Sequence, residues 1–152
     1  MTDVTKLKSA FPDVVVNVEE YRGDVTVILK QEAFLPVCTF LRDDPDYSFR
    51  FLADVTAVDY KDKTPRFVVV YHLLSHEHNQ RLRLKVPLDD MNPEIETVVN
   101  IWPTANWHER ETYDLMGVKF LNHPDLRRIL LPYHWDCHPL RKDYPLEGKG
   151  EE

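Results

Sequence analysis

The sequence predicts an α+β fold: an antiparallel sheet of about five strands, covered by helices on one face, with an extended, proline-punctuated C-terminal tail. Three observations support this prediction. Helical and β patterns follow one another in the order helix, two strands, helix, three strands, helix. One strand alternates cations with aliphatic residues, as in a sheet with one wet face. Prolines recur after Gly117 and leave no room there for a long helix.

The first third of the chain predicts two helices around a β-hairpin. A short helix over residues 3–10 ends before Pro12. Two β-rich runs, 14–19 and 24–29, flank a turn at Gly23. The stretch "QEAFLPVCTFLRDD" then has the i, i+3, i+4, i+7 spacing of a helix with one buried face, at Phe34, Val37, Cys38 and Leu41.

The middle of the chain predicts three strands and a further helix. "FRFLADVTAVDY" is a strand by its β-branched and aromatic content, and residues 66–86 read as a hairpin. In "MNPEIETVVNIW", Asn92 is a candidate N-cap and Pro93 a first helical residue. The apolar stripe of this expected helix is Ile95, Val98, Val99 and Trp102.

A last helix runs through "NWHERETYDLM" and carries two different arcs. Glu109 falls in the middle of an apolar arc of Trp102, Ala105, Tyr113 and Met116, where an isolated charge would be costly. Trp107, Arg110, Glu111 and Asp114 gather on the other arc. That second arc is either a docking patch or an ordinary solvated helix face.

The tail is too apolar to be a solvated linker, although it is broken by prolines. Its large apolar residues include Phe120, Leu126, Ile129, Leu130, Leu131, Trp135 and Leu140. We therefore divide the chain, one domain overall, into an α+β body at 1–117 and an extended docking segment at 118–152. The segment must lie on its own sheet or on a partner, and we expect it to be partly mobile until a partner binds.

Composition excludes several classes of function. With 152 residues and a net charge of −7, the chain does not suit nucleic-acid binding. No apolar run approaches the roughly 20 residues of a membrane span, and no signal peptide opens the chain. Two separated cysteines, no metal-ligand spacing, no nucleophile motif and no Gly-rich loop predict no metal, no catalytic residue and no cofactor bound by this chain.

Two motifs carry a family resemblance. The run "ERETYDLMGVKFLNHPDLRRIL" resembles the signature of the C subunit of respiratory complex I, the NADH:quinone oxidoreductase, and "HPLRKDYP" is similar to the second motif of that family. The family usually has Gly where this chain has Cys137, which leaves the local turn there open. The signature and interface residues that the resemblance marks are Glu109, Arg110, Glu111, Asp114, Gly117, Phe120, His123, Pro124, Asp125, Leu126, Arg127, Arg128, Pro139, Leu140, Arg141, Lys142 and Asp143.

The resemblance implies a subunit that binds no cofactor itself, in a complex that holds NADH, FMN, iron–sulfur clusters and quinone. It implies docking on the D subunit near the quinone site, with the B and I subunits as further neighbours, on the cytoplasmic side of the cell membrane. The complex would be a proton translocase. The alternative is a homologous subunit of a membrane-bound hydrogenase, or of a quinone or phenazine oxidoreductase fed by ferredoxin or F420H2.

Within the signature, Glu109 needs hydrogen-bond donors if it is buried. The forked guanidiniums of Arg127 and Arg128, which follow a turn at His123-Pro124, are the local candidates. We expect one of them to pair with Glu109 and to pin the start of the tail to the last helix.

Overall fold

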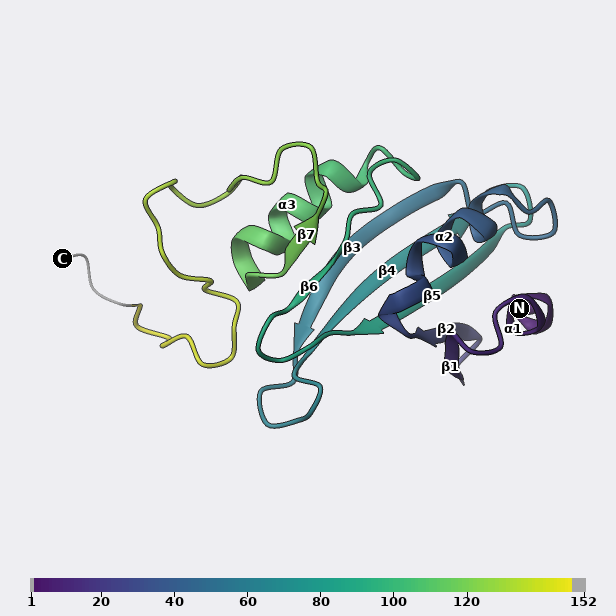
Figure 1. Ribbon diagram of the computed structural model, residues 1–152, viewed down its shortest axis with the longest axis horizontal. Coiled ribbons are helices and arrows are strands. Elements are labelled where there is room, and N and C mark those ends of the chain that lie inside the picture. The colour runs from purple at the N-terminus through teal and green to yellow at the C-terminus, as the bar shows by residue number, and fades with distance from the viewer. Residues whose placement is uncertain (1, 149–152) are drawn as a thin grey trace.

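The computed structural model describes residues 2–148 and shows helices packed on one face of a sheet (Figure 1). The helices are α1 (Thr5–Ala10), α2 (Phe34–Asp43), which follows a short 3-10 turn η1 (Gln31–Ala33), and α3 (Ala105–Met116). The strands are β1 (Val15–Tyr21), β2 (Asp24–Leu29), β3 (Phe51–Asp59), β4 (Phe67–Ser75), β5 (Gln80–Pro87), β6 (Glu94–Glu96) and β7 (Lys119–Leu121). The predicted α+β class, its five-stranded main sheet and its first two helices are confirmed.

The main sheet is mixed rather than antiparallel. Its order is β1-β2-β5-β4-β3, and β2 pairs with β5 in parallel, with Val27 opposite Leu84. The three hairpin-type pairs are antiparallel, as expected. The parallel pair arises because the chain crosses over through α2, enters the far edge at β3 and returns strand by strand to β2. No local pattern reveals where such a long-range pairing falls.

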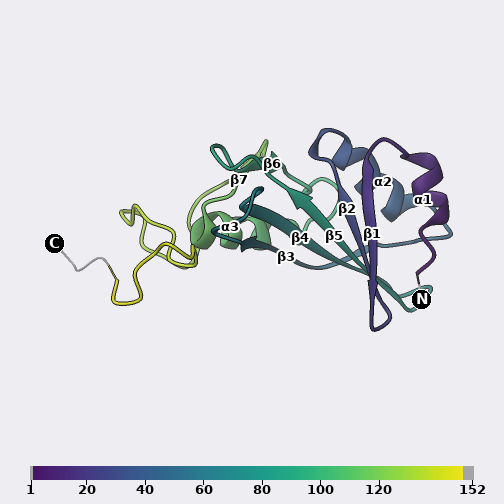
Figure 2. The same ribbon diagram turned by 90° about the horizontal axis from the view of Figure 1, so that it is seen from below.

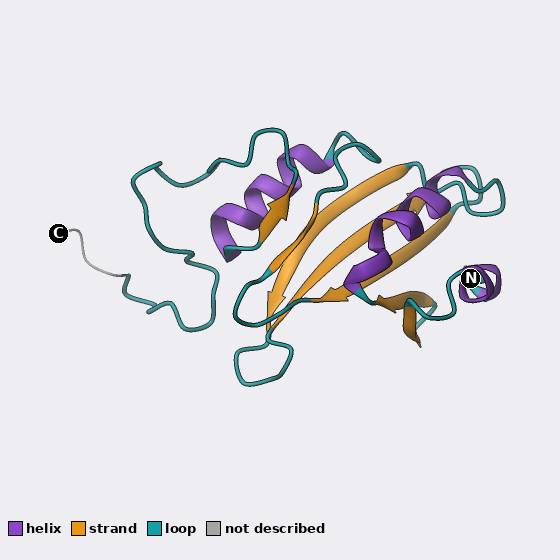
Figure 3. Cartoon of the chain, viewed as in Figure 1, coloured by secondary structure: helices purple, strands orange, loops and turns teal. Residues whose placement is uncertain are grey.

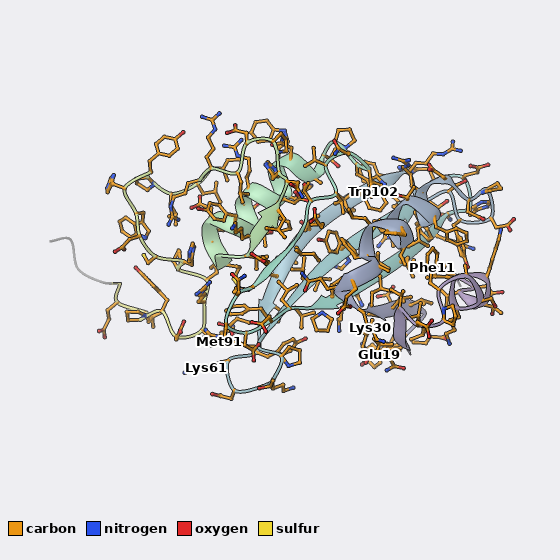
Figure 4. The ribbon with its side chains drawn as sticks, in the orientation of Figure 1. Phe11, Glu19, Lys30, Lys61, Met91 and Trp102 are labelled. Atoms are coloured by element: carbon orange, nitrogen blue, oxygen red, sulfur yellow. The ribbon has the colours of Figure 1, made fainter. Side chains whose placement is uncertain are left out.

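Both longer helices cover the same face of the sheet. The apolar stripe of α2 and the inner face of α3, with Ala105 and Met116, belong to one core with the inward residues of β2, β4 and β5. Figure 2 shows α1 and α2 to one side of the strands, and α3 lies against the edge strand β3. Trp102, labelled in Figure 4, precedes α3 in a turn and donates from Nε1 to the carbonyl of Phe49 at 2.9 Å.

The prediction of a helix over residues 92–102 is wrong. The chain there forms β6, which pairs in parallel with β7 with Ile95 opposite Phe120, and then a series of turns. The N–H of Asn92 donates to Asp89 Oδ1 at 3.0 Å, so Asn92 caps no helix. The expected stripe is nevertheless largely buried, since Ile95, Val98 and Trp102 all lie in the core. A partner strand more than twenty residues later overrides the local helical spacing.

The core extends beyond Gly117. Val118 and Phe120 are buried in it, and β7 completes the small second sheet, so the body continues through Leu121. Between residues 122 and 148 the described chain forms neither a helix nor a strand (Figure 3), and this part is referred to below as the C-terminal segment. None of the helices between residues 2 and 148 has the length and apolar composition of a membrane-spanning segment.

Candidate functional site

The C-terminal segment and α3 together hold most of the residues that the sequence marked. Figure 1 shows the segment leaving β7, running past α3 and extending away from the sheet. Helix α3 turns Glu109 and Thr112 toward the sheet, where the Thr112 hydroxyl donates to the carbonyl of Val55 at 3.0 Å. It turns Arg110 and Asp114 toward the segment, and both are buried beneath it. The alternative of a solvated second arc therefore holds only for Trp107 and Glu111, which are exposed.

Asp114 is the main anchor of the segment. One of its carboxylate oxygens, Oδ2, accepts three successive backbone N–H groups, from Ile129 at 3.0 Å, Leu130 at 2.7 Å and Leu131 at 2.9 Å. The other, Oδ1, accepts from Arg128 Nη1 at 2.6 Å. Burial alone would raise the pKa of Asp114, but these four donors outweigh it and hold the pKa below its ordinary value.

Two guanidiniums fix the backbone of the segment around this anchor. Arg128 also donates to the carbonyls of Asp114 at 3.1 Å and Cys137 at 3.2 Å. It therefore joins the helix to two parts of the segment, around residues 128 and 137. Arg110 stacks over the ring of Trp107 and donates to the carbonyls of Arg127 and Arg128 at 3.2 and 3.3 Å. The fork of an arginine suits such multiple contacts better than the single point charge of a lysine. Cys137 is buried, and its φ is not positive, so the local turn accommodates a residue other than Gly.

The second motif caps the C-terminal end of α3. The last carbonyls of a helix have no partner within it and carry partial negative charge. His138 Nδ1 lies 3.0 Å from the carbonyl of Asp114, and the N–H of Leu140 donates to Leu115 at 3.1 Å. Arg141 donates to the carbonyls of Met116 at 2.7 Å and Gly117 at 3.3 Å. The motif therefore provides donors for all the carbonyls from residue 114 to residue 117.

Gly117 makes this close approach possible. Its φ is +73°, and its N–H donates to the carbonyl of Tyr113 at 2.9 Å, as at many helix ends. A Cβ on Gly117 would collide with Arg141 Nη2 and would lie 2.5 Å from His138 Cδ2. Both the backbone conformation and the capping side chains therefore require glycine.

A third anchor holds the far part of the segment at the end of the main sheet. Asp59 accepts two hydrogen bonds from Arg66, at 2.8 and 2.7 Å, and one from the N–H of Lys142 at 2.8 Å. Arg66 also pairs with Asp143 at 3.1 Å. The Arg66 guanidinium holds the pKa of Asp59 well below its usual range. Two loops lie at this end of the sheet, and Figure 4 labels Lys61 in one and Met91 in the other. The N–H of Arg66 donates to Asp90 and so joins the two loops.

Glu109 is fully buried, but the prediction of an arginine partner for it is wrong. Its oxygens accept from the Thr97 hydroxyl and from the N–H of Val98 at 2.8 Å, and His123 Nε2 lies 3.8 Å away. Arg127 pairs instead with Asp125 at 2.8 Å, on the surface. The turn that follows β7 brings His123 rather than an arginine beside Glu109, so no guanidinium among residues 2–148 pairs with this carboxylate.

The remaining marked residues divide between the core and the surface. Phe120 is in the core, and Leu126 packs against it. Pro139 is half-buried. Exposed residues are Glu111, Pro124, Asp125, Arg127, Leu140, Lys142 and Asp143. The segment also presents large apolar side chains to solvent: Leu130, Tyr133, Leu140 and Leu146.

Several residues of this region had no recognisable signal in the sequence. Thr97 and Val98 lay in the expected helix, and Asp59 and Arg66 lay in apparently ordinary strand ends. Each is brought to the site by contacts across more than ten residues. Residues 2–148 contain no group of three or more His, Cys, Asp or Glu side chains that could hold a metal ion.

Comparison with known proteins identifies the class of this chain. Residues 27–150 match the family model described as the 30 kDa subunit of the respiratory-chain NADH dehydrogenase. The chain is thus a subunit of a respiratory oxidoreductase complex, and it belongs to the family of that 30 kDa subunit.

Individual relatives agree with this assignment. The C subunit of the NADH-quinone oxidoreductase of Geotalea uraniireducens is 50% identical over 98% of this chain and 90% of its own length. The corresponding C subunit of a Roseiflexus species is 47% identical over 95% of this chain and 83% of its own length.

Two solved structures share the fold. One is the trypsin-resistant fragment (1-134) of Nqo5, with a TM-score of 0.66, 33% identity and coverage of 72% of this chain and 89% of that one. The other belongs to an archaeal membrane-bound sulfane sulfur reductase, with a TM-score of 0.79, 21% identity and coverage of 94% and 84%. At that identity the second structure shows a common fold alone.

Replacing Asp114 by Asn should release the C-terminal segment. The amide keeps one acceptor oxygen but loses the charge that holds three N–H groups and Arg128, at a cost of roughly 3–5 kcal/mol for a broken buried pair. Chemical denaturation and limited proteolysis of the purified chain measure the loss. Glu111→Gln, on the exposed side of the same helix, is the matched control and should change neither. Unchanged protease resistance of the segment in Asp114→Asn would show that Asp114 is not its anchor.

Replacing Gly117 by Ala should destabilise the chain by about 1–3 kcal/mol. The new methyl group is strained by the positive φ and must also displace the side chains of Arg141 and His138. Gly23→Ala is the control for the strain alone, because Gly23 has a φ of +87° and no atom of residues 2–148 lies within 4 Å of an added Cβ. Thermal unfolding of the two variants separates backbone strain from the displacement of the capping side chains. Equal losses of stability would mean that Arg141 and His138 move aside without cost.

Proposed function

We propose that this chain is a structural subunit of the hydrophilic arm of a proton-translocating NADH:quinone oxidoreductase, and that it binds no redox cofactor itself. The C-terminal segment docks on the D subunit near the quinone site, and the B and I subunits are further neighbours. The protein sits peripherally on the cytoplasmic side of the membrane and reaches the membrane only through the complex. None of its residues takes part in the redox chemistry.

The observation that carries this proposal is the two-sided character of the C-terminal segment. Three of its basic groups, Arg128, His138 and Arg141, are directed inward to α3, whereas the ion pair of Asp125 and Arg127 lies on the surface. Four of its large apolar groups are directed outward, each with more than half of its surface exposed: Leu130, Tyr133, Leu140 and Leu146. Large exposed apolar side chains on one preorganised segment are typical of a binding surface. A partner that buries them gains hydrophobic free energy without the entropic cost of ordering the backbone.

The Nqo5 fragment supports this division of roles. That relative has a trypsin-resistant part consisting of residues 1–134, and its structure matches 72% of this chain. A trypsin-resistant part of that relative is what we expect of a body that folds without its docking partner.

A second candidate is a homologous subunit of another respiratory complex, such as a membrane-bound hydrogenase or a dehydrogenase fed by ferredoxin or F420H2. One observation favours this second candidate: the sulfane sulfur reductase, a complex with a different substrate, contains a chain with the same fold. Relatives near 50% identity over almost the whole chain, all of them the C subunit of NADH-quinone oxidoreductase, favour the first proposal.

Affinity isolation from native membranes distinguishes the two candidates. We expect subunits that bind NADH and flavin to co-purify with this chain, and the chain purified alone to carry no stoichiometric iron and no visible chromophore. Co-purification of a [NiFe] hydrogenase subunit instead would select the second candidate. Bound iron or flavin in the isolated chain would contradict a cofactor-free role.

Replacing Leu140 and Leu146 together by Ser should weaken binding to the D subunit about tenfold or more, because both side chains lose apolar area that the partner buries. The fold should be unaffected, since both side chains are exposed and the contact of Leu140 with α3 is made by its backbone N–H. Val16→Ser, at an exposed apolar site on β1, is the control. Binding is measured by titration with the purified D subunit, and wild-type affinity in the double variant would rule out this docking face.

A further inference from the structure

Glu109 and His123 form a buried pair in which Glu109 can gain or lose a proton while His123 stays neutral. Both side chains have no exposed surface, and His123 Nε2 lies 3.8 Å from Glu109 Oε2. The other ring nitrogen of His123, Nδ1, accepts the N–H of Asp125 at 3.0 Å. A proton on Nδ1 would face that N–H directly, so the imidazole stays neutral with its hydrogen on Nε2. That hydrogen is directed to the carbonyl of Asn106, at 3.2 Å.

Two hydrogen-bond donors and two neutral titratable groups surround Glu109. The Thr97 hydroxyl and the Val98 N–H are donors for its ionised form. Cys38 from α2 and Tyr71 from β4 lie near it, and burial keeps both neutral by raising their pKa values. The Tyr71 hydroxyl is buried and has no hydrogen-bond partner among the described residues. Burial raises the pKa of Glu109 to about 7 against the two hydrogen bonds, which lower it.

We propose that Glu109 is a proton-binding site whose occupancy selects the acceptor of His123. With the proton bound, the neutral carboxyl leaves His123 Nε2–H on the carbonyl of Asn106. When the proton leaves for solvent, the buried carboxylate draws Nε2–H across the short gap to Oε2. The ring carries the Asp125 N–H with it, so the turn at residues 123–125, where the C-terminal segment begins, shifts with the proton.

The proton also links this site to folding with a definite sign. The pKa of Glu109 is higher in the fold than its ordinary value of 4.5, so the chain takes up a proton there on folding. The protonated site stabilises the fold relative to the ionised one, and this contribution is lost as pH rises from about 4.5 to about 7. His123 and His138 act in the opposite sense, because burial lowers their pKa values: each binds a proton more readily in the unfolded chain than in the fold, so stability is lost as pH falls.

NMR of the full-length, 15N-labelled chain between pH 6 and pH 8.5 tests the proposal. In the wild type, the chemical shifts of the Asp125 amide and of the His123 ring nitrogens should change together, with a midpoint near pH 7. In Glu109→Gln, which keeps the shape and the contacts of the protonated form without a charge, both should stay at their low-pH positions. Tyr71→Phe is the matched control at the same site and should leave the transition in place.

Thr97→Val gives a second test that does not depend on the folding of Glu109→Gln. Loss of the hydroxyl donor disfavours the carboxylate and should raise the midpoint by about one pH unit. A midpoint that does not move in Thr97→Val, a transition that persists in Glu109→Gln, or no transition in the wild type would each overturn the proposal.

Discussion

The carboxylate of Asp114 is the interaction on which the rest of the C-terminal architecture depends. It accepts three consecutive N–H groups and one guanidinium, so a short stretch of extended chain is held against α3 without forming any regular structure. With residues 129–131 fixed, the chain returns to the end of the helix, where His138 and Arg141 reach its free carbonyls. Asp59 then accepts the N–H of Lys142 and holds the far part of the segment at the end of the main sheet.

Two fully buried carboxylates on the same helix behave in opposite ways, and the number of donors explains the difference. Asp114 has four donors, one of them charged, and its pKa is lowered. Glu109 has two neutral donors and a histidine beyond hydrogen-bond distance, and its pKa is raised. Burial disfavours charge at both positions, so the local donors decide which carboxyl remains ionised. The protonation state of a buried acid in a signature motif therefore cannot be assigned before its hydrogen-bond donors are known.

The buried and half-buried arginines and His138 of the family motifs are used within the chain itself. Arg110, Arg128, His138 and Arg141 contact backbone carbonyls of their own subunit, and Asp59 and Arg66 hold the far end of the segment. These contacts hold the segment in place and leave Leu130, Tyr133, Leu140 and Leu146 exposed between them. This division fits a family whose members act within a multi-subunit respiratory complex, because a segment that is already ordered binds at lower entropic cost.

Local patterns were sufficient to predict the α+β class, the hairpins, the first two helices and the burial of Glu109, because the period of the apolar residues shows which face of an element is buried. It also placed the two motifs in one family through a long ordered run of residues. The folded chain was needed to show that β2 and β5 pair in parallel and that residues 94–96 form a strand. It was also needed to show that Glu109 contacts Thr97 and lies near His123, while Asp114 pairs with Arg128. These are contacts between residues distant in the chain. Local spacing shows that a buried carboxylate needs donors, but the fold alone decides which donors reach it.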